Sequence, residues 1–245
     1  MKTVIIDQAR MTSTRLPGKV LKTVLGKPLL EYQIERLQRV ELADALVIAT
    51  TTNTTDDPIV ELCDRLGVKY YRGSEADVLA RYYEAAQKYQ ADVVVRVTSD
   101  CPLIDPKIVD RVIQFYLDQR PQCDYASNCL KRTYPRGMDT EVFSFDNLSQ
   151  AYLEATANPD REHVTPFFLQ NPERFCLMPV IAQENYSYHR WTVDTKEDFK
   201  LIKKILEAIY EQKQHFTMND CIELLNNNPS WQAINAHIEQ KQYAV

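Results

Sequence analysis

Glycine is scarce in this chain: only 5 of its 245 residues are glycine, and each stands in an expected connection between regular elements. Glycine supplies positive φ angles and flexible linkers, so we expect no flexible linker and no low-complexity segment. Internal repeats are also absent from the sequence. These absences favour one large domain, or one domain with an appendage, over a string of small modules.

Long apolar runs and paired cysteines are missing as well. No stretch approaches the roughly 20 apolar residues that span a bilayer. Asp7 brings a charge into the apolar start of the chain, so we expect neither a membrane span nor a secretory signal. The six cysteines are scattered and form no C-x-x-C pair. We therefore expect no zinc site and no disulfide framework, and we place the chain in the reducing cytoplasm.

An excess of basic charge is the third absence. The chain has 29 Lys and Arg residues against 34 Asp and Glu residues, which gives a net charge of −5. This balance argues against non-specific binding to nucleic acid or to anionic membranes. The G-x-x-x-x-G-K-[ST] motif does not occur either, so a phosphate site in this chain would not be a Walker loop.

The first half of the chain alternates apolar runs with amphipathic patterns. Strands are predicted over residues 3–6, 45–50, 68–71 and 92–97, and helices over residues 28–37, 58–66, 78–89 and 106–117. Strands that alternate with helices indicate an α/β fold whose mostly parallel sheet is covered on both faces. In such sheets ligands bind beyond the carboxyl ends of the strands, where two polar loops stand here.

The second half of the chain does not continue the regular alternation of strands and helices. From about residue 122 to residue 190, strand candidates at 141–143 and 175–181 mix with short helical pieces, and we interpret this segment as an insertion that covers the nucleotide site. A strand end is predicted at 192–194, followed by a long helix over 196–213 with a capping box. We therefore predict a main domain over 1–215 and a helical extension over 216–245, with helical pieces near 219–226 and 230–240.

The loop after the first strand carries three cations, Arg10, Arg15 and Lys19. Ser13 and Thr14 add hydroxyl groups, and the loop's backbone N–H groups add further donors. A triphosphate is bound by this combination of cations, hydroxyls and amides. The alternative interpretation is a basic loop that is simply solvated.

Two carboxylates stand where strands are predicted to end. Asp100 follows the apolar strand 92–97, and Asp194 precedes the long helix by two residues. Mg²⁺ is commonly bound by one or two carboxylates together with substrate phosphates, so these positions suit nucleotidyl or phosphoryl transfer. The alternatives are a turn cap for Asp100 and favourable electrostatics at a helix N-terminus for Asp194.

Seven segments carry a family resemblance, in order along roughly the first 200 residues. They are residues 9–19, 49–53, 72–83, 96–105, 137–143, 161–166 and 190–198. Together they resemble the cytidylyltransferases that activate keto-deoxy-octulosonate and acylneuraminate sugars, and most of all the spore-coat polysaccharide branch of that superfamily. The resemblance implies a Rossmann-like α/β/α nucleotidyltransferase fold of the GT-A-like kind, with a protruding element for dimerisation and substrate binding.

The resemblance also implies roles for individual residues. Those expected around the triphosphate and cytosine of CTP are Ala9, Arg10, Ser13, Arg15, Lys19 and Arg72. Those expected at the sugar acid are Arg136, Asp139, Glu141, Arg161 and His163. Catalytic roles fall to Arg10, Lys19, Asp100 and Asp194, with Mg²⁺ as cofactor on Asp100 and Asp194.

The activity that the resemblance implies is Mg²⁺-dependent condensation of CTP with an acidic keto-sugar, which gives a CMP-sugar and pyrophosphate for surface polysaccharide synthesis by a homodimer. Some positions depart from the family pattern. Thr12 replaces a glycine, Asp7 an apolar residue, Thr192 an acidic residue of the sialic-acid enzymes, and Arg136 a small acidic residue. Two alternatives therefore stay open: cytidylyl transfer to a phosphonate or sugar phosphate, and a GT-A-like glycosyltransferase or a non-catalytic nucleotide-sugar-binding protein.

Overall fold

The computed structural model describes residues 1–240 and is built around a seven-stranded sheet in the order β5-β4-β1-β6-β8-β7-β9. The strands of this sheet are β1 (Thr3–Gln8), β4 (Ala45–Thr51), β5 (Lys69–Gly73), β6 (Val93–Thr98), β7 (Tyr125–Ser127), β8 (Glu141–Ser144) and β9 (Leu177–Pro179). A small hairpin is formed by β2 (Thr23–Val24) and β3 (Lys27–Pro28).

The helices lie mostly between these strands in the sequence. They are α1 (Leu29–Leu37), α2 (Asp57–Leu66), α3 (Val78–Lys88), α4 (Pro106–Asp118), α5 (Phe145–Glu154), α6 (Asn158–His163), α7 (Pro166–Gln170), α8 (Lys196–Ile209), α9 (Met218–Asn227) and α10 (Pro229–Gln232), with short 3-10 helices η1 (Lys19–Leu21) and η2 (Thr54–Asp56). None of the helices within residues 1–240 is both long and apolar enough to cross a membrane.

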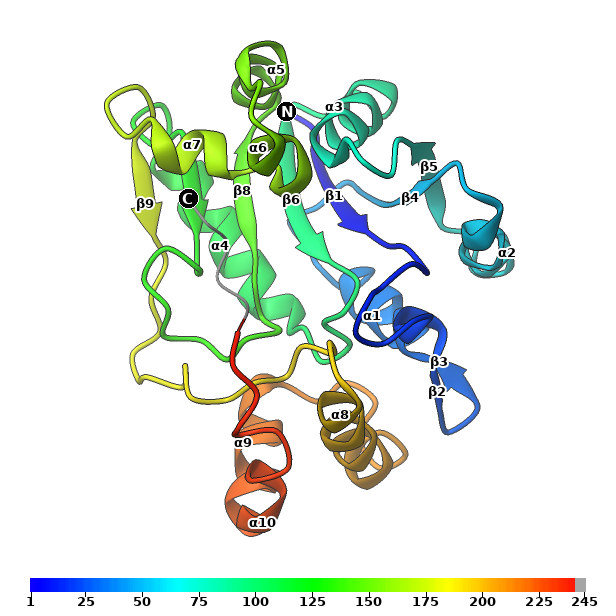
Figure 1. Ribbon diagram of the computed structural model, residues 1–245. Helices are drawn as coiled ribbons and strands as arrows, with labels where there is room; N and C mark the ends of the chain where they lie inside the picture. The colour runs from blue at the N-terminus through cyan, green and yellow to red at the C-terminus, as the bar shows by residue number, and fades with distance from the viewer. Residues whose placement is uncertain (241–245) are drawn as a thin grey trace.

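The sheet is mostly parallel, as the alternation of strands and helices predicts. Strands β5, β4, β1 and β6 run parallel to one another, and in the seven-stranded sheet of residues 1–240 only β8 runs antiparallel to both of its neighbours. Figure 1 shows α3 and α5 on one side of the sheet and α1 and α4 on the other. The predicted α/β fold with a sheet covered on both faces is therefore confirmed.

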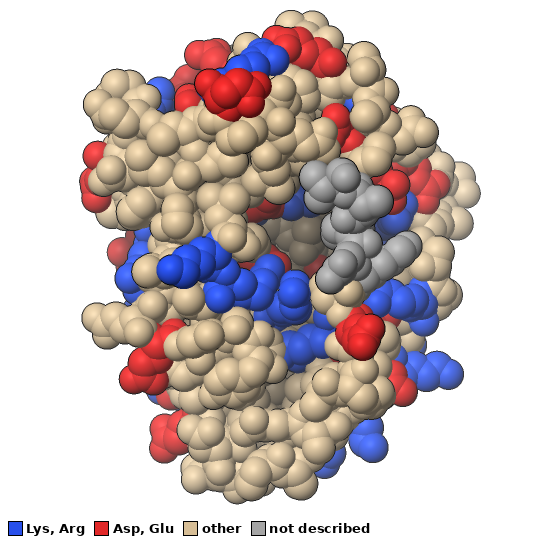
Figure 2. Space-filling model, turned by 60° about the vertical axis from the view of Figure 1, so that its left-hand side comes forward, with Lys and Arg blue, Asp and Glu red and all other residues tan. Residues whose placement is uncertain are grey.

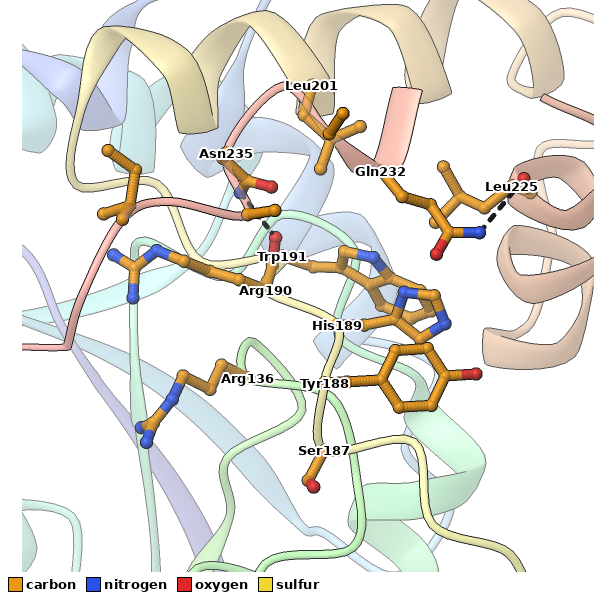
Figure 3. A pocket seen from close by; sticks show the side chains of 13 residues that line it. Arg136, Ser187, Tyr188, His189, Arg190, Trp191, Leu201, Leu225, Gln232 and Asn235 are labelled. Atoms are coloured by element: carbon orange, nitrogen blue, oxygen red, sulfur yellow. Dashed lines mark hydrogen bonds between the residues drawn. The ribbon is translucent and has the colours of Figure 1, made fainter. Parts of the chain in front are cut away.

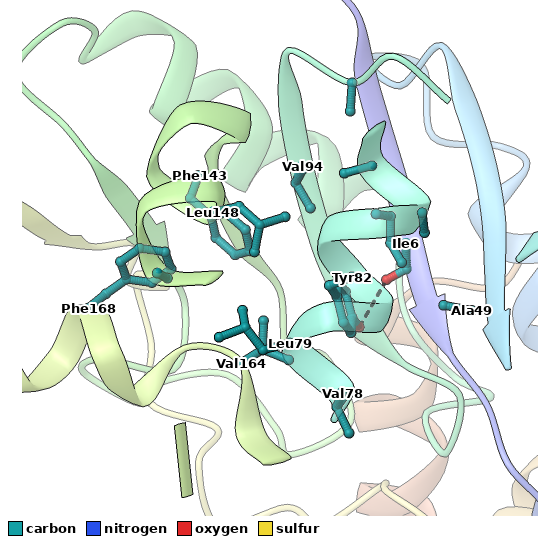
Figure 4. Close-up of a cluster of buried hydrophobic side chains, with 14 of the residues drawn as sticks. Ile6, Ala49, Val78, Leu79, Tyr82, Val94, Phe143, Leu148, Val164 and Phe168 are labelled. Carbon is teal, nitrogen blue, oxygen red and sulfur yellow. Dashed lines mark hydrogen bonds between the residues drawn. The ribbon is translucent and has the colours of Figure 1, made fainter. Parts of the chain in front are cut away.

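Apolar side chains of β1 point alternately to the two faces of the sheet, which explains why helices cover both faces. Val4 and Ile6 belong to the core cluster that contains Leu79 and Tyr82 of α3, shown in Figure 4. Ile5, between them, belongs to the cluster with α4 on the opposite face. Successive side chains of a strand point to opposite faces, so an uninterrupted apolar run buries both.

The second half of the chain extends this sheet rather than only covering it. Within the segment 122–190, β8 pairs with β6, β7 pairs with β8, and β9 pairs with β7. The predicted strand over 175–181 is shorter than expected, because only Leu177–Pro179 is paired. The prediction of a strand at 192–194 is wrong, since the N–H of Val193 donates to the carbonyl of Asp100 in a loop instead of to a neighbouring strand.

The C-terminal helices gather beside the end of the sheet from which the ligand loops project, at the bottom of Figure 1. The predicted capping box is present: Thr195 caps α8 and Asp198 returns the interaction. Residues of α8 and α9 share one core cluster with Trp191 and Val193. The helix predicted over 230–240 is shorter than expected, because α10 ends at Gln232.

Candidate active site

The site begins where β1 and β6 end side by side. Their register pairs Gln8 with Thr98, so the loop after β1 and the loop after β6 leave the sheet at the same edge. Asp100 lies two residues beyond β6, and its carboxylate accepts a hydrogen bond of 2.7 Å from the hydroxyl of Thr98. The strand end thus fixes the direction in which the Asp100 carboxylate points.

Asp194 reaches the same place through backbone contacts. The N–H of Val193 donates to the carbonyl oxygen of Asp100 over 2.8 Å, which joins two segments more than 90 residues apart. On the other side, Asp198 accepts from the N–H groups of Asp194 and Thr195, each at 3.0 Å. Asp194 is therefore held next to Asp100 by one backbone bond and by the capping box of α8.

Lys19 lies between these two carboxylates. Its Nζ is 2.8 Å from an Asp100 oxygen and 2.9 Å from an Asp194 oxygen. The second oxygen of Asp194 contacts Arg15 at 3.0 Å and Arg190 at 2.9 Å. These five residues are called the Lys19 cluster below, and they join four of the predicted site residues, Arg15, Lys19, Asp100 and Asp194, with Arg190.

The charges of the Lys19 cluster stabilise one another. Burial opposes ionisation of Asp100, but the Lys19 ammonium and the hydrogen bonds from Lys19 and Thr98 lower its pKa below the usual range. Burial alone would lower the pKa of Lys19, yet Asp100 and Asp194 raise it above the ordinary value. Lys19 and Asp100 are therefore both charged at neutral pH.

Asp7 does not lie on the surface that a bound triphosphate would contact. Its side chain is fully buried in β1, and among residues 1–240 Gln33 donates to its Oδ2 over 3.1 Å while Oδ1 accepts no hydrogen bond. Burial, with a smaller contribution from Asp100, raises the pKa of Asp7 well above the ordinary value. A buried carboxyl that favours its neutral form would not repel a bound phosphate.

The first part of the loop after β1 is anchored by a residue that the sequence did not reveal. Asp56 is fully buried and accepts from the N–H of Met11 at 2.8 Å and from the hydroxyl of Thr51 at 2.5 Å. Thr12 donates to Glu75, and Arg10 forms an ion pair with the same carboxylate at 3.6 Å. This end of the loop is fixed on β4 and on the loop before α3.

The remaining loop residues stand between these anchors. The N–H of Ala9 donates to the carbonyl of Ala49 over 3.1 Å, and the N–H of Ser13 donates to the carbonyl of Met11 over 2.9 Å. Gly18 adopts a left-handed conformation with φ of 66°, which turns the chain immediately before Lys19. The loop thus folds back on itself and delivers Lys19 to the carboxylates.

Arg72, expected near cytosine, is engaged with the neighbouring loop. Its guanidinium donates to the carbonyl oxygens of Thr51 at 2.8 Å and Asn53 at 2.7 Å, and it pairs with Asp57 at 2.7 Å. Arg72 therefore shapes the loop between β4 and α2 through its carbonyl groups. A cytosine base bound near Arg72 would lie beside the loop between β4 and α2.

The residues expected at the sugar acid are not all brought together. Glu141 lies inside the sheet, where it pairs with Arg96 and accepts from Tyr125 at 2.5 Å and Thr165 at 2.8 Å. Its hydrogen-bonding capacity is used within the fold, which does not support the predicted sugar contact. Glu141 instead links β6, β8 and the start of α7.

Arg161 is likewise engaged inside the fold. Its Nε and Nη2 contact Asp77 at 3.1 and 2.5 Å, and its Nη1 donates to the carbonyl of Tyr152 at 2.7 Å. These contacts fasten α6 to the beginning of α3, so they do not support the predicted role of Arg161 in holding the acceptor. His163, half-buried, ends the same short helix.

Asp139 and Arg136 lie on the loop before β8. Asp139 forms a two-pronged ion pair with Arg132, with distances of 2.6 and 2.8 Å. Arg136 is half-buried, and its backbone bridges to the segment before Asp194: its N–H donates to His189 and its carbonyl accepts from Trp191. Arg136 is thus the predicted sugar residue that the backbone ties directly to the segment carrying Asp194.

Three residues that fix the site were missed as functional positions: Asp56, Gln33 and Asp198. Gln33 donates to the carbonyl of Thr98 at 2.8 Å and accepts from the N–H of Cys101 at 2.9 Å, so it holds both sides of Asp100. Asp198 belongs to the capping box of α8, and it also accepts a hydrogen bond from Nε of Arg190 over 2.9 Å. A polar residue on the apolar face of a predicted helix is the sequence signal that could have indicated Gln33.

The surface around the site has the charge pattern of a binding site for an anion. Figure 2 shows a hollow in one face of the molecule, with Lys and Arg side chains gathered along it and Asp and Glu side chains inside it. A concave surface lined by cations raises the local concentration of polyanionic ligands. Acidic groups inside the same hollow suit a divalent cation that accompanies phosphates.

Comparison with known proteins identifies relatives along almost the whole chain. The family model described as cytidylyltransferase matches residues 3–223. The spore coat polysaccharide biosynthesis protein SpsF of Bacillus subtilis (strain 168) is 34% identical over 233 residues, which are 92% of this chain and 95% of that protein. A solved cytidylyltransferase structure from Leptospira borgpetersenii serovar Hardjo-bovis (strain JB197) has a TM-score of 0.91 and 35% identity, and the match covers 100% of both chains.

A more distant match supports the fold. The solved structure of CMP:2-keto-3-deoxy-manno-octonic acid synthetase complexed with CTP has a TM-score of 0.66 at 20% identity, over 85% of this chain and 99% of that one. The sequence matches confirm the resemblance inferred from the seven motifs, including the spore-coat branch.

Proposed function

The chain belongs to the cytidylyltransferase family and is a nucleotidyltransferase, and on that premise we propose that it transfers CMP from CTP to an acidic keto-sugar. The product would be a CMP-sugar used for a surface polysaccharide. The convergence of Asp100 and Asp194 on Lys19 at the carboxyl edge of the sheet carries this proposal. The name of the Bacillus subtilis relative, a spore coat polysaccharide biosynthesis protein, supports the polysaccharide context.

The proposed reaction is an in-line displacement at phosphorus. A hydroxyl oxygen of the sugar bonds to the α-phosphorus of CTP, the bond from that phosphorus to the bridging oxygen breaks, and pyrophosphate leaves. The hydroxyl proton passes to solvent. The chain's contribution is positioning and charge: Lys19 and Arg15 bind the phosphates, and the loop after β1 fixes their direction.

The residues present fit a Mg²⁺ ion. Asp100 and Asp194 offer carboxylate oxygens to one point, and the Lys19 ammonium that lies between them supports the proposal of a cation there. Mg²⁺ prefers oxygen ligands and is commonly held by one or two carboxylates plus substrate phosphates. When bound there, Mg²⁺ would neutralise charge that develops on the phosphates. The homodimer and its protruding element stay predictions.

Because of Arg136, the experiment below also includes a second class of acceptor, the sugar phosphates. A guanidinium binds a carboxylate, a phosphonate or a phosphate through the same paired N–H donors. Arg136 would therefore serve a sugar acid, which we propose, as well as a sugar phosphate. The chemistry of its side chain favours an anionic acceptor over a neutral one.

Pyrophosphate release tests the proposal. CTP, ATP, GTP and UTP are each combined with Mg²⁺ and a panel of 3-deoxy-manno-octulosonate, N-acetylneuraminate, a sugar phosphate and a neutral sugar. We expect release with CTP and a sugar acid, together with a product that contains CMP and the sugar. Release only with the sugar phosphate would move the acceptor to the second class. No release with any acceptor would refute cytidylyl transfer to these compounds.

A further inference from the structure

The last part of the chain contains one buried polar residue, Asn235. The match to the family model ends at residue 223, so α10 and the residues after it lie beyond the matched part. Among residues 226–240, Asn235 is the one residue that is buried, with an exposed fraction of 3%. Ile234 and Ile238 nearby are only half-buried. A polar side chain is rarely buried in preference to apolar neighbours unless its hydrogen bonds are made inside the fold.

The side-chain amide of Asn235 donates two hydrogen bonds to the segment that carries Asp194. Its Nδ2 is 2.9 Å from the carbonyl oxygen of Arg190 and 2.8 Å from Oδ1 of Asp198. Figure 3 shows Asn235 beside Arg190 at the cavity of about 420 Å³ that both residues line, with the first bond as a dashed line. An amide nitrogen has two N–H groups, so Asn235 uses both on residues that flank Asp194.

Arg190 connects these contacts to the Lys19 cluster. Its Nε donates to Oδ1 of Asp198 over 2.9 Å, and its Nη2 lies 3.1 Å from Oδ2 of Asp198 and 2.9 Å from Oδ2 of Asp194. Its Nη1 donates to the side chain of Gln240 over 2.5 Å. Every nitrogen of the guanidinium therefore has a partner, which fixes the orientation of the group.

Asp198 anchors this network from inside the fold. Its side chain is fully buried, and besides Arg190 and Asn235 it accepts from the N–H groups of Asp194 and Thr195. Burial alone would raise the pKa of Asp198, but the hydrogen bonds from Arg190 and Asn235 lower it below the ordinary value. Asn235 thus contributes to holding a charged carboxylate between the C-terminal segment and Asp194.

The Asp194 carboxylate depends on Arg190 more than on its other cationic partner at Oδ2. That partner, Arg15, has a side chain that is 41% exposed, whereas the side chain of Arg190 is 7% exposed. Arg15 also belongs to the loop that we expect to bind phosphates, so a bound triphosphate would engage it. Arg190 is then the buried partner that keeps the Asp194 carboxylate in one direction. Groups that orient a metal ligand affect metal affinity although they do not touch the metal.

We propose that Asn235 is a positioning residue of the nucleotidyltransferase site, which holds Arg190 and Asp198 and thereby directs the Asp194 carboxylate. The inference rests on the proposed function, because it takes Asp194 to be a ligand of Mg²⁺. It gives the C-terminal extension a role at the site, where the sequence predicted only helical pieces.

Calorimetric titration with CTP, with and without Mg²⁺, tests this role and needs no acceptor. Asn235→Ala removes both N–H donors. We expect the Kd of CTP in the presence of Mg²⁺ to rise by about five- to tenfold, and the Kd without Mg²⁺ to stay within about twofold of wild type. A residue that only stabilised the fold would lower the melting temperature without this dependence on Mg²⁺.

Asn228→Ala is the matched control. Asn228 is half-buried in the same extension, and its amide donates to the carbonyl of Leu224 over 2.9 Å. This change removes the same side-chain group but leaves the hydrogen bonds to Arg190 and Asp198 in place, so both Kd values should match wild type. Equal Mg²⁺-dependent losses in the two variants, or no such loss in Asn235→Ala, would overturn the proposal.

Asn235→Ser provides a second variant in case Asn235→Ala does not fold. Its single hydroxyl can donate to the carbonyl of Arg190 or to Asp198, but not to both. We expect the Kd of CTP with Mg²⁺ to rise by about two- to threefold, and the Kd without Mg²⁺ to stay unchanged. Wild-type affinity under both conditions would overturn the proposal.

A double-mutant cycle with Arg190→Lys tests whether Asn235 acts through Arg190. The lysine keeps a positive charge but loses the paired contacts of the guanidinium. If the two residues act together, the combined loss of Mg²⁺-dependent CTP affinity is smaller than the product of the two single losses. Single losses that multiply in the double variant would show independent action and overturn the proposal.

Pyrophosphate release separates this inference from the proposed function. If Asn235→Ala weakens CTP binding only in the presence of Mg²⁺, while wild type releases no pyrophosphate with any acceptor, the inference stands and the proposed function is refuted. Pyrophosphate release by wild type, together with unaltered CTP binding in Asn235→Ala, would refute the inference and retain the proposed function.

Discussion

Two charged clusters lie within four residues of each other along β6 and its loop, and they differ in what surrounds them. In the first, Arg96 of β6 pairs with Glu141, which also receives the hydroxyls of Tyr125 and Thr165. In the second, Asp100 belongs to the Lys19 cluster. Both contain a cation and a carboxylate that was expected at the site, Glu141 in the first and Asp100 in the second, so residue type alone does not distinguish them.

The first cluster is closed by the register of the sheet. Arg96 and Glu141 are direct partners across β6 and β8, and all donors come from elements packed around them. Burial alone would lower the pKa of Arg96, but Glu141 raises it. The Glu141 carboxylate is engaged by Arg96, Tyr125 and Thr165, so we expect the pair to stabilise the fold.

The Lys19 cluster is assembled from loops and has an open side. Its members come from the loop after β1, the loop after β6 and the segment before α8. The Arg15 side chain is 41% exposed, whereas the side chains of Arg96 and Glu141 are 15% and 9% exposed. The comparison teaches that a charged residue at a strand's end, held by distant loops, is a better candidate for function than one paired within the sheet.

The strongest test of this difference removes one charge from the open cluster. Asp194→Asn keeps the shape of the side chain but weakens a proposed metal ligand. We expect kcat/KM to fall by about 10³-fold, which corresponds to about 4 kcal/mol of transition-state stabilisation. The melting temperature should fall less than in a variant of the closed cluster, because the backbone N–H of Asp194 keeps its hydrogen bond to Asp198. Steady-state pyrophosphate release and thermal denaturation give the two measurements.

Asp118→Asn serves as the control for Asp194→Asn, since Asp118 is an exposed carboxylate at the end of α4. It should leave both activity and melting temperature unchanged. A large loss of stability in Asp194→Asn with activity retained below the melting temperature would reverse the roles assigned to the two clusters.

The matching change in the closed cluster is Glu141→Gln. It leaves Arg96 buried without its anion, and breaking a buried pair in this way costs about 3 kcal/mol of stability or more. We expect a lower denaturant midpoint in a urea titration, while the KM values for CTP and the acceptor stay within about twofold of wild type. A raised acceptor KM with unchanged stability would restore Glu141 as a sugar contact.

A smaller effect is expected for Lys19→Met, which removes the cation but keeps an unbranched side chain. Phosphate contacts do not depend on the base, so we expect the dissociation constants of CTP and UTP to rise by a similar factor of about 10 to 100. Calorimetric titration measures both. Lys22→Met is the control, because the ammonium of Lys22 lies over the ring of Phe199, 5.7 Å from its centroid. Equal losses in the two variants would contradict a specific role for Lys19.

The smallest effect concerns Asp7, a buried carboxyl near the open cluster. Its pKa is raised in the folded state, so its contribution to stability is complete below the unfolded pKa of about 4 and is lost as pH rises through the folded pKa. Asp7→Asn does not titrate. Its melting temperature should therefore exceed that of wild type by a few degrees at neutral pH, and the gain should shrink towards pH 4.

Melting curves between pH 4 and pH 8 measure this difference, with Asp118→Asn as the exposed control. A gain for Asp7→Asn that is independent of pH would show that the carboxyl is not neutral in the folded protein. The exposed control should show no pH-dependent gain.

The sequence predicted the parts that depend on local pattern. Apolar alternation indicated the parallel strands, and the capping pattern at Thr195 and Asp198 indicated where α8 begins. The seven motifs indicated the family and selected Lys19, Asp100 and Asp194, which the structure brings together. These predictions required only near neighbours in the sequence or an established family resemblance.

The remaining features depend on contacts between distant segments. Glu141 and Arg161 stand in family motifs, but their partners, Arg96 and Asp77, come from other elements and could not be read from the chain. The prediction of a strand at 192–194 is wrong because the N–H of Val193 donates to the carbonyl of Asp100 instead of to a neighbouring strand. Strand register and hydrogen bonds between distant segments thus determine which charged residues are paired within the fold.

The most direct test of the central claim measures how Mg²⁺ affects CTP binding to wild type and Asp194→Asn by isothermal calorimetry. If Asp100 and Asp194 hold the metal against the phosphates, Mg²⁺ should raise the CTP affinity of wild type by about tenfold or more, and of Asp194→Asn by less than about threefold. The same Mg²⁺ effect in both proteins would contradict a metal site formed by these two carboxylates.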